Sequence, residues 1–182
     1  MASTDGRQAA RRQNTLTVDV RIEIPRGSRN KYEYDDRRHC FVLDRVLYSS
    51  VHYPTDYGFV PRTLAPDGDH LDALVVVHEP TFPGCLIPAR PIGLLDMIDE
   101  QGPDAKLLAV PVGDPRFQEI HALDDLSPHW LREIENFFAT YKYLEGVRTE
   151  MRGWLGVEAA MNYLRICQAR FAGSEQVRSR EP

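Results

Sequence analysis

The stretch Leu16-Thr17-Val18-Asp19-Val20-Arg21-Ile22-Glu23-Ile24 alternates apolar and polar residues without a break. Successive side chains of a β-strand point to opposite faces, so a period of two predicts a strand with one buried face. Glu23 falls on the polar face, away from the apolar side chains. The body of the chain is therefore predicted to begin with a half-buried strand.

Five further runs have the apolar or β-branched character of strands, and Gly, Pro and Asp residues separate them. They are Lys31 to Tyr34, Cys40 to Leu43, Leu74 to His78, Arg90 to Ile98 and Lys106 to Val110. Short strands joined by frequent turns favour a small barrel over a layered parallel sheet.

The pattern becomes helical near Ser127. Ser127-Pro128 is a typical N-cap and first helical position, and an apolar stripe follows it. A second helix is predicted from Val157, with an inward stripe of Val157, Met161, Leu164, Gln168 and Phe171. Strands first and helices last indicate an α+β class, with two main helices packed outside the strands.

The length of 182 residues predicts one domain. Residues 1–14 and 172–182 are polar and are predicted to be flexible tails, which leaves 15–171 as the domain. The arginines of residues 1–14 faintly resemble those of a transit peptide, but a flexible tail is the stronger interpretation.

Charge and composition exclude several classes of protein. The formal net charge is −5, which argues against a nucleic-acid binder that relies on a basic face. No stretch approaches the ~20 apolar residues needed to cross a bilayer. The three cysteines are far apart and form no C-x-x-C pair, so we expect free, buried thiols and a reducing, cytoplasmic location.

Lysine is rare in this chain. Of the 22 basic residues, only Lys31, Lys106 and Lys142 are lysines, and the others are arginines. A compact ammonium fits among metal ions and phosphoryl oxygens where a broad guanidinium does not. On composition alone, chance explains the pattern equally well.

The densest polar cluster is Asp67-Gly68-Asp69-His70-Leu71-Asp72. Three carboxylates on one turn repel each other unless a cation holds them, and oxygen donors without thiolates select hard ions such as Mg²⁺ or Mn²⁺. A calcium EF-hand would need Gly and Glu where this chain has Asp72 and His78, so that loop type is excluded. A solvated acidic turn is an equal alternative for this cluster alone.

Other polar residues favour a functional interpretation. Asp99 and Asp104 flank a turn that leads into Lys106, and Lys31 and Glu33 share one strand face. Arginine and tyrosine side chains are available nearby, while the glycine-rich nucleotide motifs are absent. Carboxylates for Mg²⁺ and cations for phosphate oxygens are what metal-assisted phosphoryl transfer to water requires.

From about Leu16 to Phe171 the sequence resembles the family I soluble inorganic pyrophosphatases of the bacterial branch. The resemblance rests on seven pieces in order, each weak alone and highly specific together. They are Ile22-Glu23-Ile24-Pro25, Asn30-Lys31-Tyr32-Glu33, Asp44-Arg45, Tyr53-Pro54-Thr55-Asp56-Tyr57-Gly58, Asp67 to Asp72, Asp99 through Asp104-Ala105-Lys106, and Tyr141-Lys142. All three lysines fall on substrate-site positions of the family, which makes chance a poor explanation of the lysine pattern.

The resemblance implies a five-stranded OB-like β-barrel with the helices outside, an active site at the barrel mouth and, in bacteria, usually a homohexamer. It implies hydrolysis of inorganic pyrophosphate to two phosphates with Mg²⁺, or Mn²⁺ in its place, and Asp69 as general base beside a water that bridges two metal ions. The implied metal ligands are Asp67, Asp72, Asp99, Asp104 and Glu33, with Glu23 in an outer position. The implied phosphate-binding residues are Lys31, Arg45, Tyr57, Lys106, Tyr141 and Lys142, with Tyr53 supporting them.

The chain departs from the family pattern in two places. His70 stands where the family has Pro or sometimes Glu, so we predict a flexible, titratable residue that changes metal affinity or the pH optimum without abolishing activity. A solvated turn residue is the alternative for His70. The family stretch Glu-x-Gly-Lys is here Glu145-Gly146-Val147-Arg148, and Arg148 is the candidate substitute for the missing rim lysine.

Two other functions are weaker. Hydrolysis of a nucleotide or polyphosphate would need a base-stacking pocket or a second phosphate track, and neither is visible in the sequence. A binding protein for nucleic acid or for other subunits would need a basic, aromatic-lined groove, whereas this chain is rich in acids. We therefore expect neither nucleic acid nor membrane as a partner.

Overall fold

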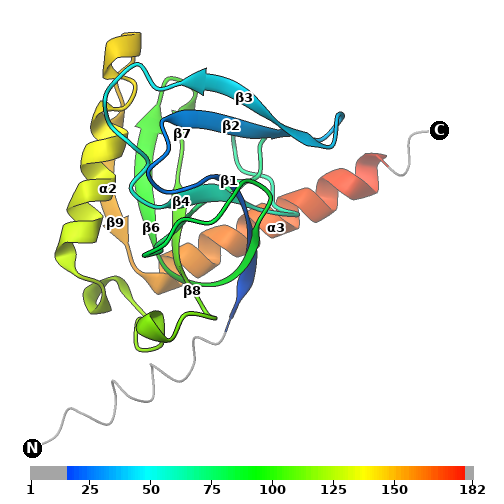
Figure 1. Cartoon of the computed structure of the whole chain (residues 1–182). Helices are drawn as coiled ribbons and strands as arrows, with labels where there is room; N and C mark the ends of the chain where they lie inside the picture. Colours follow the sequence, from blue (N-terminus) through cyan, green and yellow to red (C-terminus); the bar gives the residue numbers. More distant parts are fainter. Residues whose placement is uncertain (1–15, 179–182) are drawn as a thin grey trace, which may run out of the picture.

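The computed structural model describes residues 16–178 and has the predicted α+β character, with most strands before the two helices and one strand between them (Figure 1). The first strand, β1 (Val18–Ile24), buries every second side chain, as its alternation predicts. Leu16 differs from the prediction because it precedes the strand and is exposed.

Seven strands of the described chain form one sheet. Besides β1 they are β4 (Asp56–Val60), β5 (Leu71–Val75), β6 (Leu86–Asp99), β7 (Gly102–Pro103), β8 (Lys106–Pro111) and β9 (Glu150–Leu155). The β5–β8 pair is parallel and the other pairs are antiparallel. Because β1 pairs with both β4 and β6, the pairing runs from β1 through β4, β5, β8 and β6 and returns to β1.

A separate two-stranded sheet is formed by β2 (Asn30–Asp35) and β3 (Cys40–Val46), at the top of Figure 1. Its link to β1 includes a hydrogen bond of 2.8 Å, in which the Tyr34 amide donates to Glu23 Oε1. The Arg21 guanidinium of β1 also lies 4.7 Å from the centre of the Tyr34 ring. The hairpin therefore stands over the larger sheet rather than within it.

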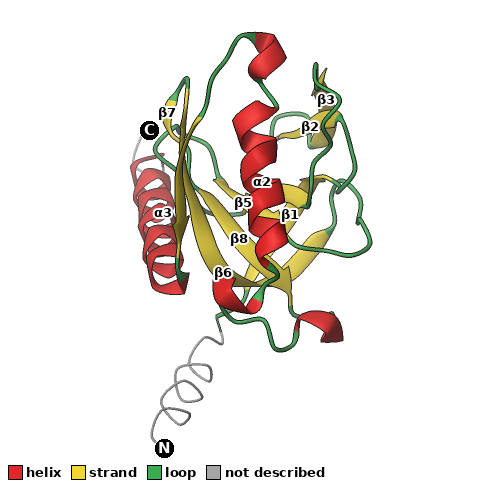
Figure 2. Cartoon of the chain, turned by 90° about the vertical axis from the view of Figure 1, so that its left-hand side faces the viewer, coloured by secondary structure: helices red, strands yellow, loops and turns green. Residues whose placement is uncertain are grey.

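Both predicted helices begin where the sequence places them. The helix α2 (Pro128–Thr140) buries Ile134, Phe137 and Phe138, although the Ser127 side chain makes no capping hydrogen bond. The helix α3 (Val157–Arg178) buries Met161, Leu164 and Cys167, whereas the predicted stripe residue Gln168 is exposed. Figure 2 shows the two helices on opposite sides of the strands.

The central strands are buried on both faces. Ala73 and Val75 of β5 pack in the hydrophobic cluster that includes α3, and Leu74 packs in the cluster that includes α2. The strand β8 behaves in the same way, because Leu107 and Leu108 belong to different clusters. Strands enclosed in this manner have continuous apolar runs and little freedom to move.

Several boundaries differ from the sequence predictions. The sequence does not predict β4 or β9, and β5 begins and ends three residues earlier than predicted. The helix α3 continues through residues 172–178, which are predicted to be part of a tail. The predicted tail 1–14 and residues 179–182 lie outside the described residues. Short 3₁₀ helices occur at Pro115–Phe117 (η1), Leu123–Asp125 (η2) and Tyr143–Glu145 (η3).

The strand β4 carries Asp56, Tyr57 and Gly58, which do not resemble a buried strand in sequence. Asp56 is nevertheless fully buried, because its carboxylate accepts hydrogen bonds from the Arg26 amide and from Thr81. Gly58 permits close pairing with β1, since a Cβ there would lie 1.9 Å from the Arg21 carbonyl oxygen. Because the polar residues of β4 are satisfied by buried partners, this strand lacks the apolar pattern from which a strand is predicted.

The three cysteines are free, as predicted, but only Cys167 is buried and Cys40 is exposed. Among the described residues, no helix combines the length and the apolar character that a membrane crossing requires.

Candidate active site

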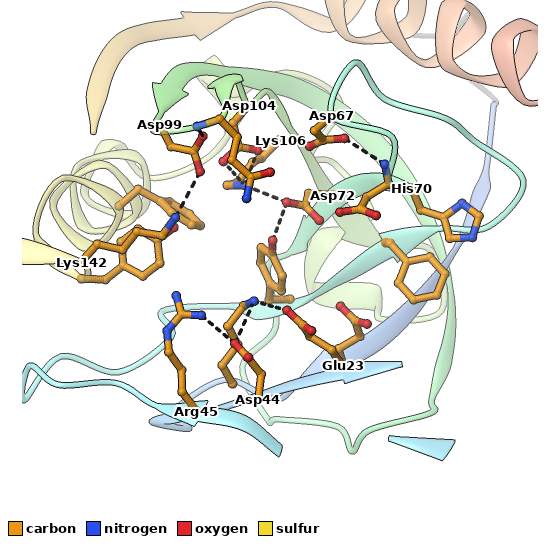
Figure 3. A pocket seen from close by; sticks show the side chains of 18 of the residues that line it. Glu23, Asp44, Arg45, Asp67, His70, Asp72, Asp99, Asp104, Lys106 and Lys142 are labelled. Atoms are coloured by element: carbon orange, nitrogen blue, oxygen red, sulfur yellow. Dashed lines mark hydrogen bonds and ion pairs between the residues drawn. The ribbon is translucent and has the colours of Figure 1, made fainter. Parts of the chain in front are cut away.

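A pocket of about 510 Å³ opens between the larger sheet and the β2–β3 hairpin (Figure 3). Apart from Arg148, every side chain that the sequence singles out for metal binding, phosphate binding or proton transfer lines it. These side chains are Glu23, Lys31, Glu33, Arg45, Tyr53, Tyr57, Asp67, Asp69, Asp72, Asp99, Asp104, Lys106, Tyr141 and Lys142.

Lys106 lies at the base of the pocket, on the first residue of β8. Its side chain is 2% exposed, and Nζ donates to Asp72 Oδ2 and Asp104 Oδ1, both at 2.8 Å. The Tyr57 hydroxyl donates to the same Asp72 oxygen. Burial alone would lower the pKa of Lys106, but the charges of Asp72 and Asp104 outweigh it and hold the pKa above its ordinary value. Lys106 is therefore a buried ammonium ion.

The carboxylates that line the pocket carry more negative charge than its lysines can neutralise. Burial, Asp67, Asp72 and Glu33 raise the pKa of Asp69 above its ordinary value. Burial and the charge of Asp72 raise the pKa of Asp104, although Lys106 opposes this. A carboxylate whose pKa rises is one that an additional cation would stabilise in its charged form.

Glu23 shows the strongest effect of this kind. Burial, with smaller contributions from Asp72 and Glu33, raises its pKa from 4.5 to about 7, although the Tyr34 amide hydrogen bond opposes the shift. Figure 3 places Glu23 below the group formed by Asp67, Asp72 and Asp104. Glu23 thus lies where the hairpin and the larger sheet meet.

Lys31 and Arg45 enter the pocket from the hairpin. Lys31 forms ion pairs with Glu33 and with Asp44 Oδ2, the latter at 3.3 Å. Arg45 pairs with Asp44 at 2.6 Å and reaches Glu145 of η3 at 3.3 Å. The side chains of Lys31 and Arg45 are 21% and 26% exposed, so both cations remain accessible to a ligand.

Lys142 enters from the opposite end, after α2. Its Nζ donates to Asp99 Oδ2 at 3.1 Å and to both carboxylate oxygens of Glu100, at 2.8 and 3.0 Å. Burial alone would lower the pKa of Lys142, but Tyr141, Glu100 and Asp99 raise it above its ordinary value. The hydrogen bonds from the Gln101 amide and from Lys142 outweigh burial and lower the pKa of Asp99.

The loop of residues 61–70 presents Asp67 and Asp69. The Asp69 amide donates to Asp67 Oδ1 at 3.0 Å, and the Ala65 amide donates to the Asp69 carbonyl oxygen at 2.8 Å. Gly68 adopts φ +98°, a left-handed conformation that glycine accommodates without strain. The tip is therefore a closed turn, with both carboxylates exposed.

Four carboxylates that the sequence does not assign also line the pocket: Asp36, Asp44, Glu100 and Glu145. Asp44, Glu100 and Glu145 each form an ion pair with a predicted phosphate-binding cation. Asp44 and Glu100 are adjacent in sequence to assigned residues, which is the signal that could have identified them. No assigned residue is adjacent to Glu145 in sequence. Its partner Arg45 lies 100 positions away.

The two departures from the family pattern have different outcomes. Arg148 is exposed and is not among the residues that line the pocket, so nothing in the structure supports it as a substitute for the rim lysine. His70 does line the pocket, and its ring is packed against other side chains rather than standing free as a solvated turn residue. Its ring stacks on Phe59, and Nδ1 lies 2.7 Å from the Thr63 carbonyl oxygen.

The donor set fits a hard divalent cation, because it consists of carboxylate oxygens and contains no thiolate. Within residues 16–178, no three acidic, histidine or cysteine side chains already converge as a metal-binding cluster. Lys106 and Lys142 lie between the carboxylates instead. Burial is the main cause of the raised pKa values of Glu23, Asp69 and Asp104, and repulsion from neighbouring carboxylates adds to it; a cation bound among these carboxylates would relieve that repulsion.

A pocket of this volume that combines lysines and an arginine with many carboxylates belongs to the class of sites for small, highly charged anions. Comparison with known proteins makes the assignment specific. The inorganic pyrophosphatase family model matches residues 20–172.

Two relatives and a solved structure agree with this match. The inorganic pyrophosphatase of Synechocystis sp. is 55% identical over 150 residues, which cover 82% of this chain and 89% of that protein. That of Geobacillus stearothermophilus is 54% identical over 154 residues, covering 85% and 93%. The crystal structure of inorganic pyrophosphatase from Thermus thermophilus has a TM-score of 0.84 at 44% identity and covers 88% of this chain and 94% of that one. The chain belongs to the inorganic pyrophosphatase family.

Proposed function

We propose that this protein hydrolyses inorganic pyrophosphate to two orthophosphates. The observation that carries the proposal is the convergence of Lys31, Arg45, Lys106 and Lys142 in one acid-lined pocket. Four cations can neutralise a small anion of high charge, and the carboxylates around them can retain divalent cations at the same time. The printed names of the relatives, which are inorganic pyrophosphatases, support the same substrate.

The proposed cofactor is Mg²⁺, with Mn²⁺ as a possible replacement. Asp67, Asp72, Asp99, Asp104 and Glu33 would hold it, and Glu23 would support them from behind. Bound divalent ions would supply Lewis acidity, lowering the pKa of water and neutralising charge on the phosphates.

The chain's own residues then have two tasks. The Asp69 carboxylate accepts the proton of the attacking water, and its raised pKa brings it closer to the pH at which a base works best. Lys31, Arg45 and Lys142 hold phosphate oxygens and orient the scissile bond. Three tyrosine hydroxyls assist as hydrogen-bond donors, because burial raises the pKa of Tyr53, Tyr57 and Tyr141 and keeps them protonated.

We further propose that the closed pairing of β1, β4, β5, β8 and β6 is the OB-like barrel that the resemblance implies, with the pocket at its mouth. The homohexamer and the cytoplasmic location are proposals of the same kind. Phe82, Leu86 and Val112 are exposed apolar side chains available for subunit contacts. Light scattering should give a particle of six times the chain mass of 20.8 kDa.

Phosphate release tests the proposed activity. With Mg²⁺ we expect rapid hydrolysis of pyrophosphate, much slower hydrolysis of ATP, and no hydrolysis of either substrate in EDTA. Equal rates with ATP or with polyphosphate would instead indicate a general phosphoanhydride hydrolase. Absence of phosphate release from pyrophosphate with both Mg²⁺ and Mn²⁺ would refute the proposal.

Asp69→Asn tests the proposed base. We expect kcat to fall about 10²- to 10⁴-fold, the range of general-base catalysis, while circular dichroism remains that of the native protein. Asp124→Asn, at an exposed carboxylate outside the pocket, is the matched control and should leave kcat unchanged. A near-normal rate for Asp69→Asn would place the base elsewhere.

A further inference from the structure

A column of contacting side chains runs along one side of the pocket. The Arg21 guanidinium lies 4.7 Å from the Tyr34 ring centre and 5.8 Å from that of Phe59. Phe59 stacks on His70 with centroids 4.8 Å apart and an interplanar angle of 12°, and His70 contacts Phe171 of α3 at 6.0 Å. The column therefore connects the hairpin, β1, β4, the loop 61–70 and α3.

His70 has a second attachment at the base of the loop. Its Nδ1 lies 2.7 Å from the Thr63 carbonyl oxygen, and a carbonyl can only accept, so Nδ1 donates. Thr63 is fully buried, and its hydroxyl donates to the Val60 carbonyl oxygen and accepts from the Leu71 amide at 2.8 Å. Both ends of the loop thus meet at one buried threonine.

This arrangement fixes the residues between the two ends. The Leu64 amide donates to the Cys167 carbonyl oxygen of α3 at 2.9 Å, and the tip is closed by the Ala65 to Asp69 hydrogen bond. Figure 3 shows the His70 ring at the side of the pocket, turned away from Asp72. The neighbouring carboxylates can therefore face the centre of the pocket while the His70 ring packs at its edge.

We propose that His70 is a positioning residue, whose ring packing on Phe59 holds Asp67 and Asp69 in the orientation that the pocket requires, with a smaller contribution from its hydrogen bond to Thr63. The proposal rests on the proposed function, because it assigns those carboxylates to a metal ion and to the attacking water. It invokes the shape and the donor of the imidazole and not its charge. Groups that orient ligands from behind typically change metal affinity or activity about 10- to 100-fold when removed.

Four variants separate packing from other effects. His70→Ala removes the ring and the hydrogen bond, and His70→Leu keeps apolar volume without a planar ring. His70→Phe keeps the planar ring without the donor or the titratable group. The matched control is His78→Ala, because His78 stacks on Phe117 at 5.2 Å and 19° and lies outside the pocket.

Three readouts are needed: Mn²⁺ binding by calorimetry without substrate, amide hydrogen exchange across residues 61–72, and kcat and KM for pyrophosphate. We expect His70→Ala and His70→Leu to weaken Mn²⁺ binding about tenfold, to lower kcat more than they raise KM, and to accelerate exchange in the loop. His70→Phe should recover most of the affinity and of kcat. His78→Ala should change none of these quantities.

Two results would overturn the proposal. One is a His70→Ala variant that matches His78→Ala in Mn²⁺ affinity, kcat and loop exchange, which would make His70 a merely structural residue. The other is a His70→Phe variant as impaired as His70→Ala, since ring packing would then not position the loop. If the wild-type protein released no phosphate, the proposed function would fail, whereas Mn²⁺ binding and loop exchange would still decide the role of His70.

Discussion

The pocket has two unlike sides. The sheet wall (Tyr57, Asp72, Asp104 and Lys106) belongs to β4, β5, the start of β8 and the short link before β8, and its lysine is 2% exposed. The hairpin rim consists of Lys31, Glu33, Asp44 and Arg45, and its two cations are 21% and 26% exposed. Both sides pair cations with carboxylates, but only the wall does so within the folded core.

The difference predicts different roles for similar charges. Removing one partner of an ion pair that is excluded from water strongly destabilises the folded protein, whereas an exposed pair contributes little to stability. We therefore expect changes in the wall to affect folding and function together. Changes in the rim should affect substrate binding and leave the free energy of unfolding almost unchanged.

Lys106→Met and Lys31→Met form a matched pair that tests this contrast most strongly. Lys106→Met leaves Asp72 and Asp104 without their buried cation, so the free energy of unfolding should fall by about 3 kcal/mol. Lys31→Met should change it by less than about 1 kcal/mol. Urea unfolding in EDTA measures both variants, and equal losses would show that the wall and the rim do not differ.

Glu23 lies between the two sides and is expected to give the second largest change in the free energy of unfolding. Its pKa is 4.5 in the unfolded chain and about 7 in the folded one, so between these values the folded protein binds the extra proton. Stability from this group is therefore complete below 4.5 and is lost as the pH rises through about 7. We expect the loss to be about 3 kcal/mol in metal-free buffer and to be absent in Glu23→Gln. Urea unfolding of both proteins across this pH range measures the loss. Parallel curves of unfolding free energy against pH for the two proteins would contradict the prediction.

Arg45→Lys tests the rim by its effect on binding. A lysine keeps the charge but cannot present two parallel N–H donors to a phosphate, so KM for pyrophosphate should rise about tenfold. The midpoint of urea unfolding should remain that of the wild type. Arg132→Lys, at an exposed arginine outside the pocket, is the control for general effects of the exchange. A KM equal to that of the control would remove Arg45 from the binding site.

Glu145→Gln should have the smallest effect. The Glu145 carboxylate competes with a bound phosphate for Arg45, so its neutralisation should lower KM about twofold. The free energy of unfolding should change by less than about 0.5 kcal/mol, because the ion pair is partly exposed. Initial-rate kinetics of Glu145→Gln, compared with the control Glu133→Gln at an exposed glutamate of α2, would detect the difference. An increased KM for Glu145→Gln would show that Glu145 positions Arg45 instead.

The rim was easier to predict from sequence than the wall was. The alternation around Lys31 and Glu33 places both side chains on one strand face, and they do line the same pocket. The strand β4 was missed because Asp56 satisfies its buried carboxylate through Arg26 and Thr81, and no local pattern reveals such partners. Tertiary hydrogen bonds therefore override the local sequence pattern in the wall.

The column around His70 shows the same limit. The sequence identified His70 as unusual because it stands where the family has a proline, but it could not show that the ring packs on Phe59 of β4 and Phe171 of α3. The ion pair between Arg45 and Glu145 also joins residues that are distant in sequence. Residue type and spacing indicated the chemistry of the pocket, whereas the partner of each charge depended on the fold.

A crystal structure with Mn²⁺ and imidodiphosphate, a diphosphate mimic that resists hydrolysis, tests the central claim most directly. We predict anomalous scattering from Mn²⁺ beside Asp67, Asp72 and Asp104, with the mimic bound by Lys31, Arg45 and Lys142. A pocket without Mn²⁺ and without the mimic, in crystals soaked at saturating concentrations, would contradict the account.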